Sequence, residues 1–165
     1  MINDSKIMLE KAMLEIRKLS TTLLPPSLGE IGLLDALEDL IENIKEVNAL
    51  QIETNWSNFS EDLLSEKLKL TIFRIVQEQL NNIIKHSQAA TAFISLKKIN
   101  KIIRLNIKDD GIGFNMATKR NGVGLRNITS RAEVNNGTVV LESQPGAGCK
   151  IEVSFSIPER TNKNN

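Results

Sequence analysis

Polar side chains recur at helical spacing in the middle of the sequence and could hold a ligand. Arg74, Glu78 and Asn82 are four residues apart, and Lys85 or His86 continues the series. On a helix these positions form one stripe beside an apolar face. An amide oxygen suits Mg²⁺, which usually keeps several waters and bridges to phosphate oxygens. The stripe therefore indicates either a face that presents a carboxylate, an amide and a cation to a ligand, or a simple solvated helix face.

A glycine-containing segment follows directly after a predicted strand. It reads Asp109-Asp110-Gly111-Ile112-Gly113. Its glycines allow the backbone to approach a flat ligand, and the Asp109 carboxylate offers that ligand a hydrogen-bond acceptor. Asp-Gly is also a common turn dipeptide, so a plain turn remains the alternative.

A second glycine segment, Gly122-Val123-Gly124-Leu125, opens a predicted helix. The first amides of a helix have no intrahelical partner, and with the helix dipole they favour an anion such as phosphate. The alternative is an ordinary loop at a helix start. The segment is not a Walker-type loop, because no Gly-Lys-Ser/Thr follows it. A further pair, Gly146 and Gly148, is predicted to form a β-turn.

Helices and strands that would position these residues can be read from apolar periodicity and from cap residues. The proline pair at 25–26 ends a first helix, and Ser60 is the expected N-cap of the long helix that carries the polar stripe. The pattern predicts an α+β fold of two layers. The predicted helices cover 5–24, 33–47, 60–86 and 124–134, and the predicted strands cover 50–56, 91–98, 102–109, 138–143 and 150–157.

The composition is that of an ordinary soluble globular protein of 165 residues, with 41% hydrophobic and 25% charged residues. The formal net charge of +1 gives no electrostatic reason to expect nucleic acid as a partner. The single cysteine, Cys149, excludes an internal disulfide and makes a reducing, cytoplasmic location the expectation. These numbers define the class of protein and say nothing about its activity.

The ordered motifs resemble those of the ATP-binding domain shared by histidine kinases, DNA gyrase, heat-shock chaperones and mismatch-repair ATPases. The matching segments read FRIVQEQLNNIIKHS, DDGIGF and GVGLRNITSRAEVNNG. Within that superfamily the chain is most similar to sensor histidine kinases of the nitrate/nitrite-sensor type. The resemblance implies a Bergerat-type fold: a two-layer α/β sandwich with helices on one face of a mixed, mainly antiparallel sheet. ATP would lie between the helices and a short lid over residues 114–121.

The resemblance also implies roles for single residues, with ATP and Mg²⁺ as cofactors. Asn82 would hold Mg²⁺ through its side-chain oxygen, and Glu78 would order a Mg²⁺-bound water. Lys85 would reach the phosphates, and His86 would line the same wall.

The two glycine segments take roles in nucleotide binding by the same resemblance. Asp109 would accept a hydrogen bond from the adenine amino group, while Gly111 and Gly113 would leave room for the ring. The remaining implied contacts are with the phosphates, at the helix start formed by Gly122, Gly124 and Leu125.

The resemblance implies three parts. Residues 1–26 would be the second helix of a dimerisation and phosphoacceptor domain, 27–158 the ATP-binding catalytic domain, and 159–165 a disordered tail. The subgroup's acceptor histidine belongs to a helix that should precede Met1, and His86 lies within an ATP-binding motif. We therefore expect the acceptor on a histidine-bearing helix outside this chain, in a homodimeric parent kinase that passes phosphate to a response regulator.

Two alternative functions share the same motifs. One is a serine protein kinase of the anti-sigma-factor type, against which the dimerisation-like leader through Leu24 argues. The other is a nucleotide-binding signalling module without transferase activity.

Overall fold

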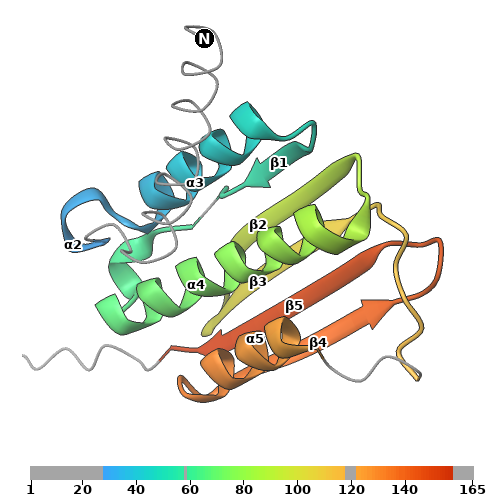
Figure 1. The fold of residues 1–165 in the computed structure, drawn as a ribbon. Coiled ribbons are helices and arrows are strands. Elements are labelled where there is room, and N and C mark those ends of the chain that lie inside the picture. Colours follow the sequence, from blue (N-terminus) through green and yellow to red (C-terminus); the bar gives the residue numbers. More distant parts are fainter. Residues whose placement is uncertain (1–27, 58, 118–121, 158–165) are drawn as a thin grey trace, which may run out of the picture.

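One five-stranded sheet, in the order β1-β2-β3-β5-β4, is covered on one face by helices (Figure 1). The computed structural model describes residues 28–57, 59–117 and 122–157. Only β1 and β2 are parallel, and the other neighbours are antiparallel. The expected mixed, mainly antiparallel sheet with helices on one side is confirmed. The strands are β1 (Gln51–Asn55), β2 (Thr91–Ile99), β3 (Ile102–Asp109), β4 (Gly137–Ser143) and β5 (Cys149–Ser156).

The helical layer consists of two longer helices over the sheet, a shorter one beside them, and three short turns of helix (Figure 1). The α-helices are α2 (Leu28–Ile31), α3 (Leu33–Val47), α4 (Glu66–Asn82) and α5 (Val123–Glu133). A 3₁₀ turn, η1 (Glu61–Leu63), precedes α4, and a π-helical turn, η2 (Ile83–Ser87), ends it. The predicted first helix and the predicted tail lie outside the described residues, as does the proposed junction at residue 26.

The core lies between α4 and the central strands. Alternate residues of β3 and β5 point toward the helices, and the residues between them lie on the opposite face. Each fully buried aliphatic side chain contributes about 1.5–3 kcal/mol to folding. Because this burial fixes which face of each strand points to the helices, it also fixes the direction of the last residue of β3, Asp109, which faces the helical layer. The side chains buried here are Ile72, Ile75, Val76 and Leu80 of α4, Ile103, Leu105 and Ile107 of β3, and Ile151, Val153 and Phe155 of β5.

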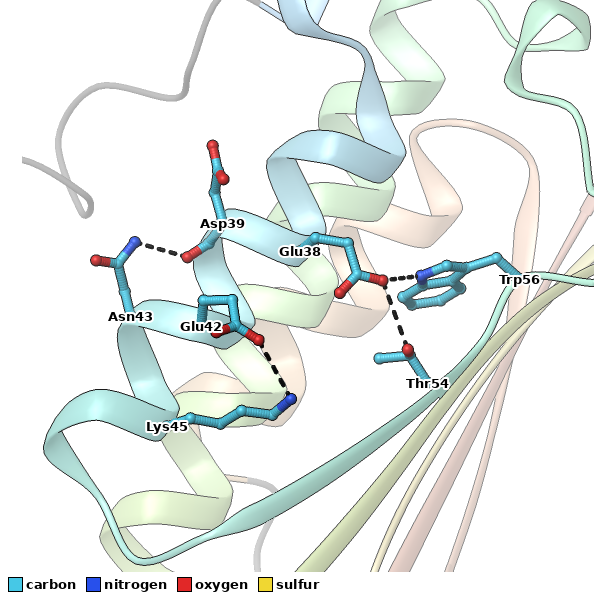
Figure 2. Close-up of polar contacts among 7 residues, drawn as sticks. All are labelled: Glu38, Asp39, Glu42, Asn43, Lys45, Thr54 and Trp56. Carbon is cyan, nitrogen blue, oxygen red and sulfur yellow. Dashed lines mark hydrogen bonds and ion pairs between the residues drawn. The ribbon is translucent and has the colours of Figure 1, made fainter.

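Helix α3 is fastened to the edge strand β1 by a half-buried carboxylate (Figure 2). Glu38 accepts hydrogen bonds from the indole N–H of Trp56 and, at 3.5 Å, from Thr54 Oγ1. An ion pair between Lys45 and Glu42 joins one helical turn to the next on the exposed side. The Glu38 carboxylate thus holds α3 against the edge strand β1.

The expected N-cap of the long helix was wrong. Ser60 donates to Asp62 Oδ2 at 3.0 Å and precedes η1, whereas the N-cap of α4 is Ser65, five residues later. There Ser65 Oγ accepts from the Leu68 amide at 3.3 Å. Both serines precede an acidic residue, so local sequence does not distinguish them. The structure distinguishes them, because the Ser65 side chain caps the Leu68 amide while the Ser60 side chain makes no cap hydrogen bond.

Candidate nucleotide site

The start of α5 lies directly against the polar stripe of α4. A Cβ added to Gly124 would be 2.7 Å from Asn82 Oδ1 and 2.7 Å from Glu78 Oε1. A larger residue at position 124 would displace the ends of the Asn82 and Glu78 side chains. Three of the candidate residues are therefore brought together: a carboxylate and an amide oxygen from α4, and the first turn of α5.

The first amides of α5, which lie beside Asn82 and Glu78, have no hydrogen-bond partner within the helix. The first backbone bond of the helix runs from the Arg126 amide to the Gly122 carbonyl at 3.2 Å. The N-cap residue Gly122 has no side chain with which to cap the earlier amides. Those amides and the positive end of the helix dipole favour an anion at this position. Oxygen ligands on one side and amide donors on the other suit a cation bound to a phosphate.

Gln79 is a residue of this site that sequence reasoning missed. Its side chain is only 3% exposed, among the apolar residues of α4. Asn82 Nδ2 donates to Gln79 Oε1 at 3.4 Å, which leaves Asn82 Oδ1 on the side of Gly124. A buried amide on an otherwise apolar face was the available signal, since buried polar groups need partners.

Asp109 closes β3 on the helical side of the sheet and is 2% exposed. Its Oδ1 accepts from the Gly111 amide at 3.0 Å. Burial raises the pKa of the Asp109 carboxyl, and the Asp110 charge adds to this, while backbone hydrogen bonds from Gly111 and Cys149 act in the opposite direction. A carboxyl buried in this way is available as a specific acceptor for a ligand that donates hydrogen bonds.

Asp110, the next residue, is exposed and has a different role. Its carboxylate accepts from the Ala90 and Thr91 amides, both at 2.9 Å, and from Thr91 Oγ1 at 2.8 Å. The hydrogen bonds from Thr91 hold the pKa of Asp110 below its usual value. Asp110 therefore fixes the start of β2 beside the end of β3, and only Asp109 faces the helical layer.

The glycines after Asp109 make room for the protein's own backbone. A Cβ on Gly111 would lie 2.3 Å from the Ser87 carbonyl oxygen, which accepts from the Ile112 amide at 2.7 Å. Gly113 has φ +57°, and its Cβ would lie 2.0 Å from the Gln144 carbonyl oxygen. The space beside both Cα atoms, expected to serve a ligand ring, is thus filled by the chain itself. Contact of these glycines with a ring stays a prediction.

Gly148 does more than form the turn expected for it. It has φ +72°, and a Cβ there would lie 2.0 Å from the Asp109 carbonyl oxygen. Ser143 Oγ donates to the Gly148 carbonyl at 2.8 Å and accepts from the Phe114 amide at 3.0 Å. The β4–β5 turn therefore packs under the strand end that carries Asp109. This tertiary contact leaves no mark in the local sequence.

The remaining candidates are less closely placed. Lys85 and His86 are exposed in η2, where i→i+5 bonding takes them off the α-helical stripe. Gly122 is exposed, and a Cβ there would meet no atom within 4 Å. Leu125 packs partly against the core. Of the expected lid, residues 114–117 are described and the rest lies outside the described residues.

A layer of helices covers one face of the mixed sheet, and Asn82 and Glu78 of α4 lie against the start of α5. Residues 68–161 match the family model described as histidine kinase-, DNA gyrase B- and HSP90-like ATPase. This match covers the stripe and both glycine segments, and the chain belongs to that family. Domains of this family bind ATP, usually with Mg²⁺.

Curated relatives of this chain are sensor histidine kinases. It is 33% identical to the sensor histidine kinase LiaS of Bacillus subtilis, over 91% of this chain and 41% of LiaS. It is 29% identical to the oxygen sensor histidine kinase NreB of Staphylococcus carnosus, over 88% of this chain and 42% of NreB. The chain thus spans less than half the length of these relatives. It is the catalytic ATP-binding domain found in such kinases.

Solved structures agree on the fold. The histidine kinase domain of a blue-light activated histidine kinase from Erythrobacter litoralis superposes with a TM-score of 0.62 at 15% identity. The superposition covers 76% of this chain and 65% of that one. Among the residues that the structure describes, no helix is both long and apolar enough to cross a membrane.

Proposed function

We propose that this domain binds Mg-ATP between α4 and α5 and passes the γ-phosphoryl group to a histidine outside this chain. The supporting observation is that Gly124, at the start of α5, lies against Asn82 Oδ1 and Glu78 Oε1 of α4. This arrangement supports a Mg²⁺ site beside a helix end that would receive the phosphates. A parent kinase of the nitrate/nitrite-sensor type is the finer assignment that the motifs favour. This assignment includes residues 1–26 as the second dimerisation helix, a homodimer, a response regulator as phosphate recipient, and a cytoplasmic location.

Each site residue has a definite task in this proposal. Asp109 would accept from the adenine amino group, Asn82 would hold Mg²⁺ through Oδ1, and Glu78 would order a Mg²⁺-bound water. The amides at the start of α5 receive the phosphates. Bound Mg²⁺ would neutralise charge on the phosphate oxygens, and the protein would contribute positioning and further charge stabilisation. Lys85 and His86 lie at the exposed rim, where they would reach a phosphate chain.

Radiolabelled ATP distinguishes this function from its alternatives. The chain is incubated with labelled Mg-ATP, alone and with the separately produced acceptor domain of the parent kinase. We expect no label on the chain itself and acid-labile, base-stable label on the acceptor domain. Acid-stable label on an added protein would instead favour a serine kinase, and ATP binding without transfer would favour a signalling module. Robust label on His86 would contradict its placement in the ATP-binding motif.

A further inference from the structure

Gln79 is a polar residue on the apolar face of α4. It lies four residues after Ile75 and four before Ile83, both of which are buried. Residues at this spacing share one face of a helix, so Gln79 belongs to the face that packs into the core. Only 3% of the residue is exposed, and its side-chain amide is therefore largely removed from water. Burial of an amide is unfavourable unless a hydrogen bond replaces the lost water, so the partner of this amide indicates what the residue does.

The hydrogen-bond partner of Gln79 is Asn82, the proposed Mg²⁺ ligand. Asn82 Nδ2 donates to Gln79 Oε1 at 3.4 Å from the next turn of α4. A side-chain amide has an oxygen end and a nitrogen end of nearly equal shape, and only the oxygen end can bind a metal ion. Because Gln79 offers an acceptor, it holds the nitrogen end and leaves the oxygen for a ligand. A Cβ on Gly124 would lie 2.7 Å from Asn82 Oδ1 and 3.1 Å from Nδ2, so the oxygen is the end nearer to α5.

We propose that Gln79 is a positioning residue that selects the orientation in which the Asn82 amide presents its oxygen to Mg²⁺. This inference rests on the proposed function. Asn82 is half-buried, so water could satisfy its amide in either orientation, and the fixed acceptor of Gln79 favours one of them. With the amide reversed, two N–H donors would face the cation, and these cannot ligate it. An oxygen that is already oriented avoids the cost of ordering the side chain when Mg-ATP binds.

The orientation of the Asn82 amide can be tested without nucleotide. In nitrogen–proton correlation NMR spectra, the side-chain NH₂ signals of Asn82 are assigned by their absence from Asn82→Ala. One of the two hydrogens should exchange with water about 3-fold or more slowly in wild type than in Gln79→Leu, the effect of one hydrogen bond. Equal exchange in the two proteins would overturn the proposal.

Mg²⁺-dependent affinity tests the consequence for the site. A fluorescent ATP analogue is titrated with and without Mg²⁺. Gln79→Leu keeps a side chain of similar size and removes the acceptor. It should bind about 10-fold more weakly in Mg²⁺, as when a partner of a metal ligand is lost, and change less than about 2-fold without Mg²⁺. Gln79→Glu keeps an acceptor oxygen and should stay within about 3-fold of wild type in Mg²⁺.

The matched control is Gln77→Leu, the same change two residues earlier on α4. The Gln77 side chain accepts from Arg74 Nη1 at 2.7 Å. We expect Gln77→Leu to bind the analogue within about 2-fold of wild type in Mg²⁺. An equal loss in Gln77→Leu and Gln79→Leu would show that any such change in α4 weakens binding, and the specific role of Gln79 would be wrong.

Urea unfolding separates positioning from ordinary packing. A leucine at this buried position removes an amide from the core, so Gln79→Leu should be at least as stable as wild type. Gln79→Glu brings a carboxyl to the same place and should be less stable. The leucine variant should therefore lose affinity and keep stability, and the glutamate variant should do the reverse. Mg²⁺-dependent affinity that follows stability in both variants would reduce Gln79 to a packing residue.

The outcomes also separate this inference from the proposed function. Equal affinities of wild type and Gln79→Leu in Mg²⁺ would overturn the role of Gln79 while Mg-ATP binding by the domain stands. Absence of Mg²⁺-dependent binding by wild type would contradict the proposed function. In that case the exchange comparison still decides whether Gln79 orients the Asn82 amide.

Discussion

Two neighbouring aspartates show how position on a strand separates residues of the same type. Asp109 continues the inward series of Ile103, Leu105 and Ile107, so strand alternation alone places it on the helical side. Asp110 faces outward and binds backbone at the start of β2. The sequence could predict this division because β3 runs without a bulge to its last residue. It could not predict the Cys149 amide beneath Asp109, which comes from a strand far along the chain.

The raised pKa of Asp109 predicts a pH dependence of stability. A carboxyl with a folded-state pKa above its unfolded value of 3.8 stabilises the fold below that value and loses this contribution as pH rises through the folded pKa. Urea unfolding without nucleotide should therefore show wild type losing stability relative to Asp109→Asn between pH 4 and neutrality. Asp110→Asn is the matched control with the opposite sign, because the Asp110 pKa is lowered. The same pH trend in both variants would contradict this assignment.

Asp109 should also select the base of the nucleotide. An ionised carboxylate accepts from the 6-amino group of adenine but faces the 6-oxo acceptor of guanine. An unpaired buried acceptor costs about 1–3 kcal/mol, which is roughly 5- to 150-fold in favour of ATP. Calorimetric titration with ATP and GTP measures this preference. Comparable affinities for ATP and GTP would mean that Asp109 only stabilises the turn after β3 and does not contact the base.

At the scale of elements, most helices and strands could be predicted from apolar periodicity, and each error has a specific physical cause. The boundaries of α3 and β3 agree with those expected. The 3₁₀ turn before α4 was missed because Ser60 and Ser65 both resemble N-caps. The π-helical turn was also missed; its last residue, Ser87, lies against Gly111 and accepts from the Ile112 amide, a contact that local sequence does not reveal. The ends of α4 therefore depend on contacts with segments that are distant in the sequence.

The contact between α4 and α5 predicts different outcomes for two nearby glycines. Gly124→Ala would place a methyl group 2.7 Å from Asn82 Oδ1 and Glu78 Oε1, so the ends of these two side chains must move. We expect at least about a 10-fold loss of Mg-ATP affinity, as for a displaced metal partner. Gly122→Ala meets no atom within 4 Å and should change affinity less than about 2-fold. Equal effects of the two changes in a nucleotide titration would argue against the close approach as the reason for Gly124.

Glu61 joins two elements and should matter for stability. Its carboxylate accepts from the Leu33 amide at the start of α3 and lies 3.6 Å from Lys69 of α4. Gly32, the N-cap residue, has no side chain with which to do this. Glu61→Ala should lower the free energy of unfolding by about 1–2 kcal/mol in urea titrations, as for other lost N-caps. Glu61→Gln keeps an acceptor and should lose less; an equal loss would mean that the lost cap is not the cause.

At the scale of the whole molecule, the sheet holds two distant parts of a binding site on one side. Asp109 is fixed at the end of β3, and α4 and α5, which pack against each other and over β3 and β4, hold Asn82 beside Gly124. The family could be assigned from three sequence motifs, because their order and spacing reflect this arrangement. The packing of Gly111 against Ser87 and the hydrogen bond between Gln79 and Asn82 could not be predicted in this way. Both depend on contacts that exist only in the folded chain.

Mg²⁺-dependent ATP binding by Asn82 is the central claim and has a direct test. Titration with a fluorescent ATP analogue, with and without Mg²⁺, compares wild type, Asn82→Ala and the adjacent control Asn81→Ala. Losing a metal ligand should weaken Mg-dependent binding about 10-fold or more in Asn82→Ala. Binding without Mg²⁺ should change little, and Asn81→Ala should bind like wild type. Equal affinities of wild type and Asn82→Ala in Mg²⁺ would contradict the claim and remove Asn82 from the site.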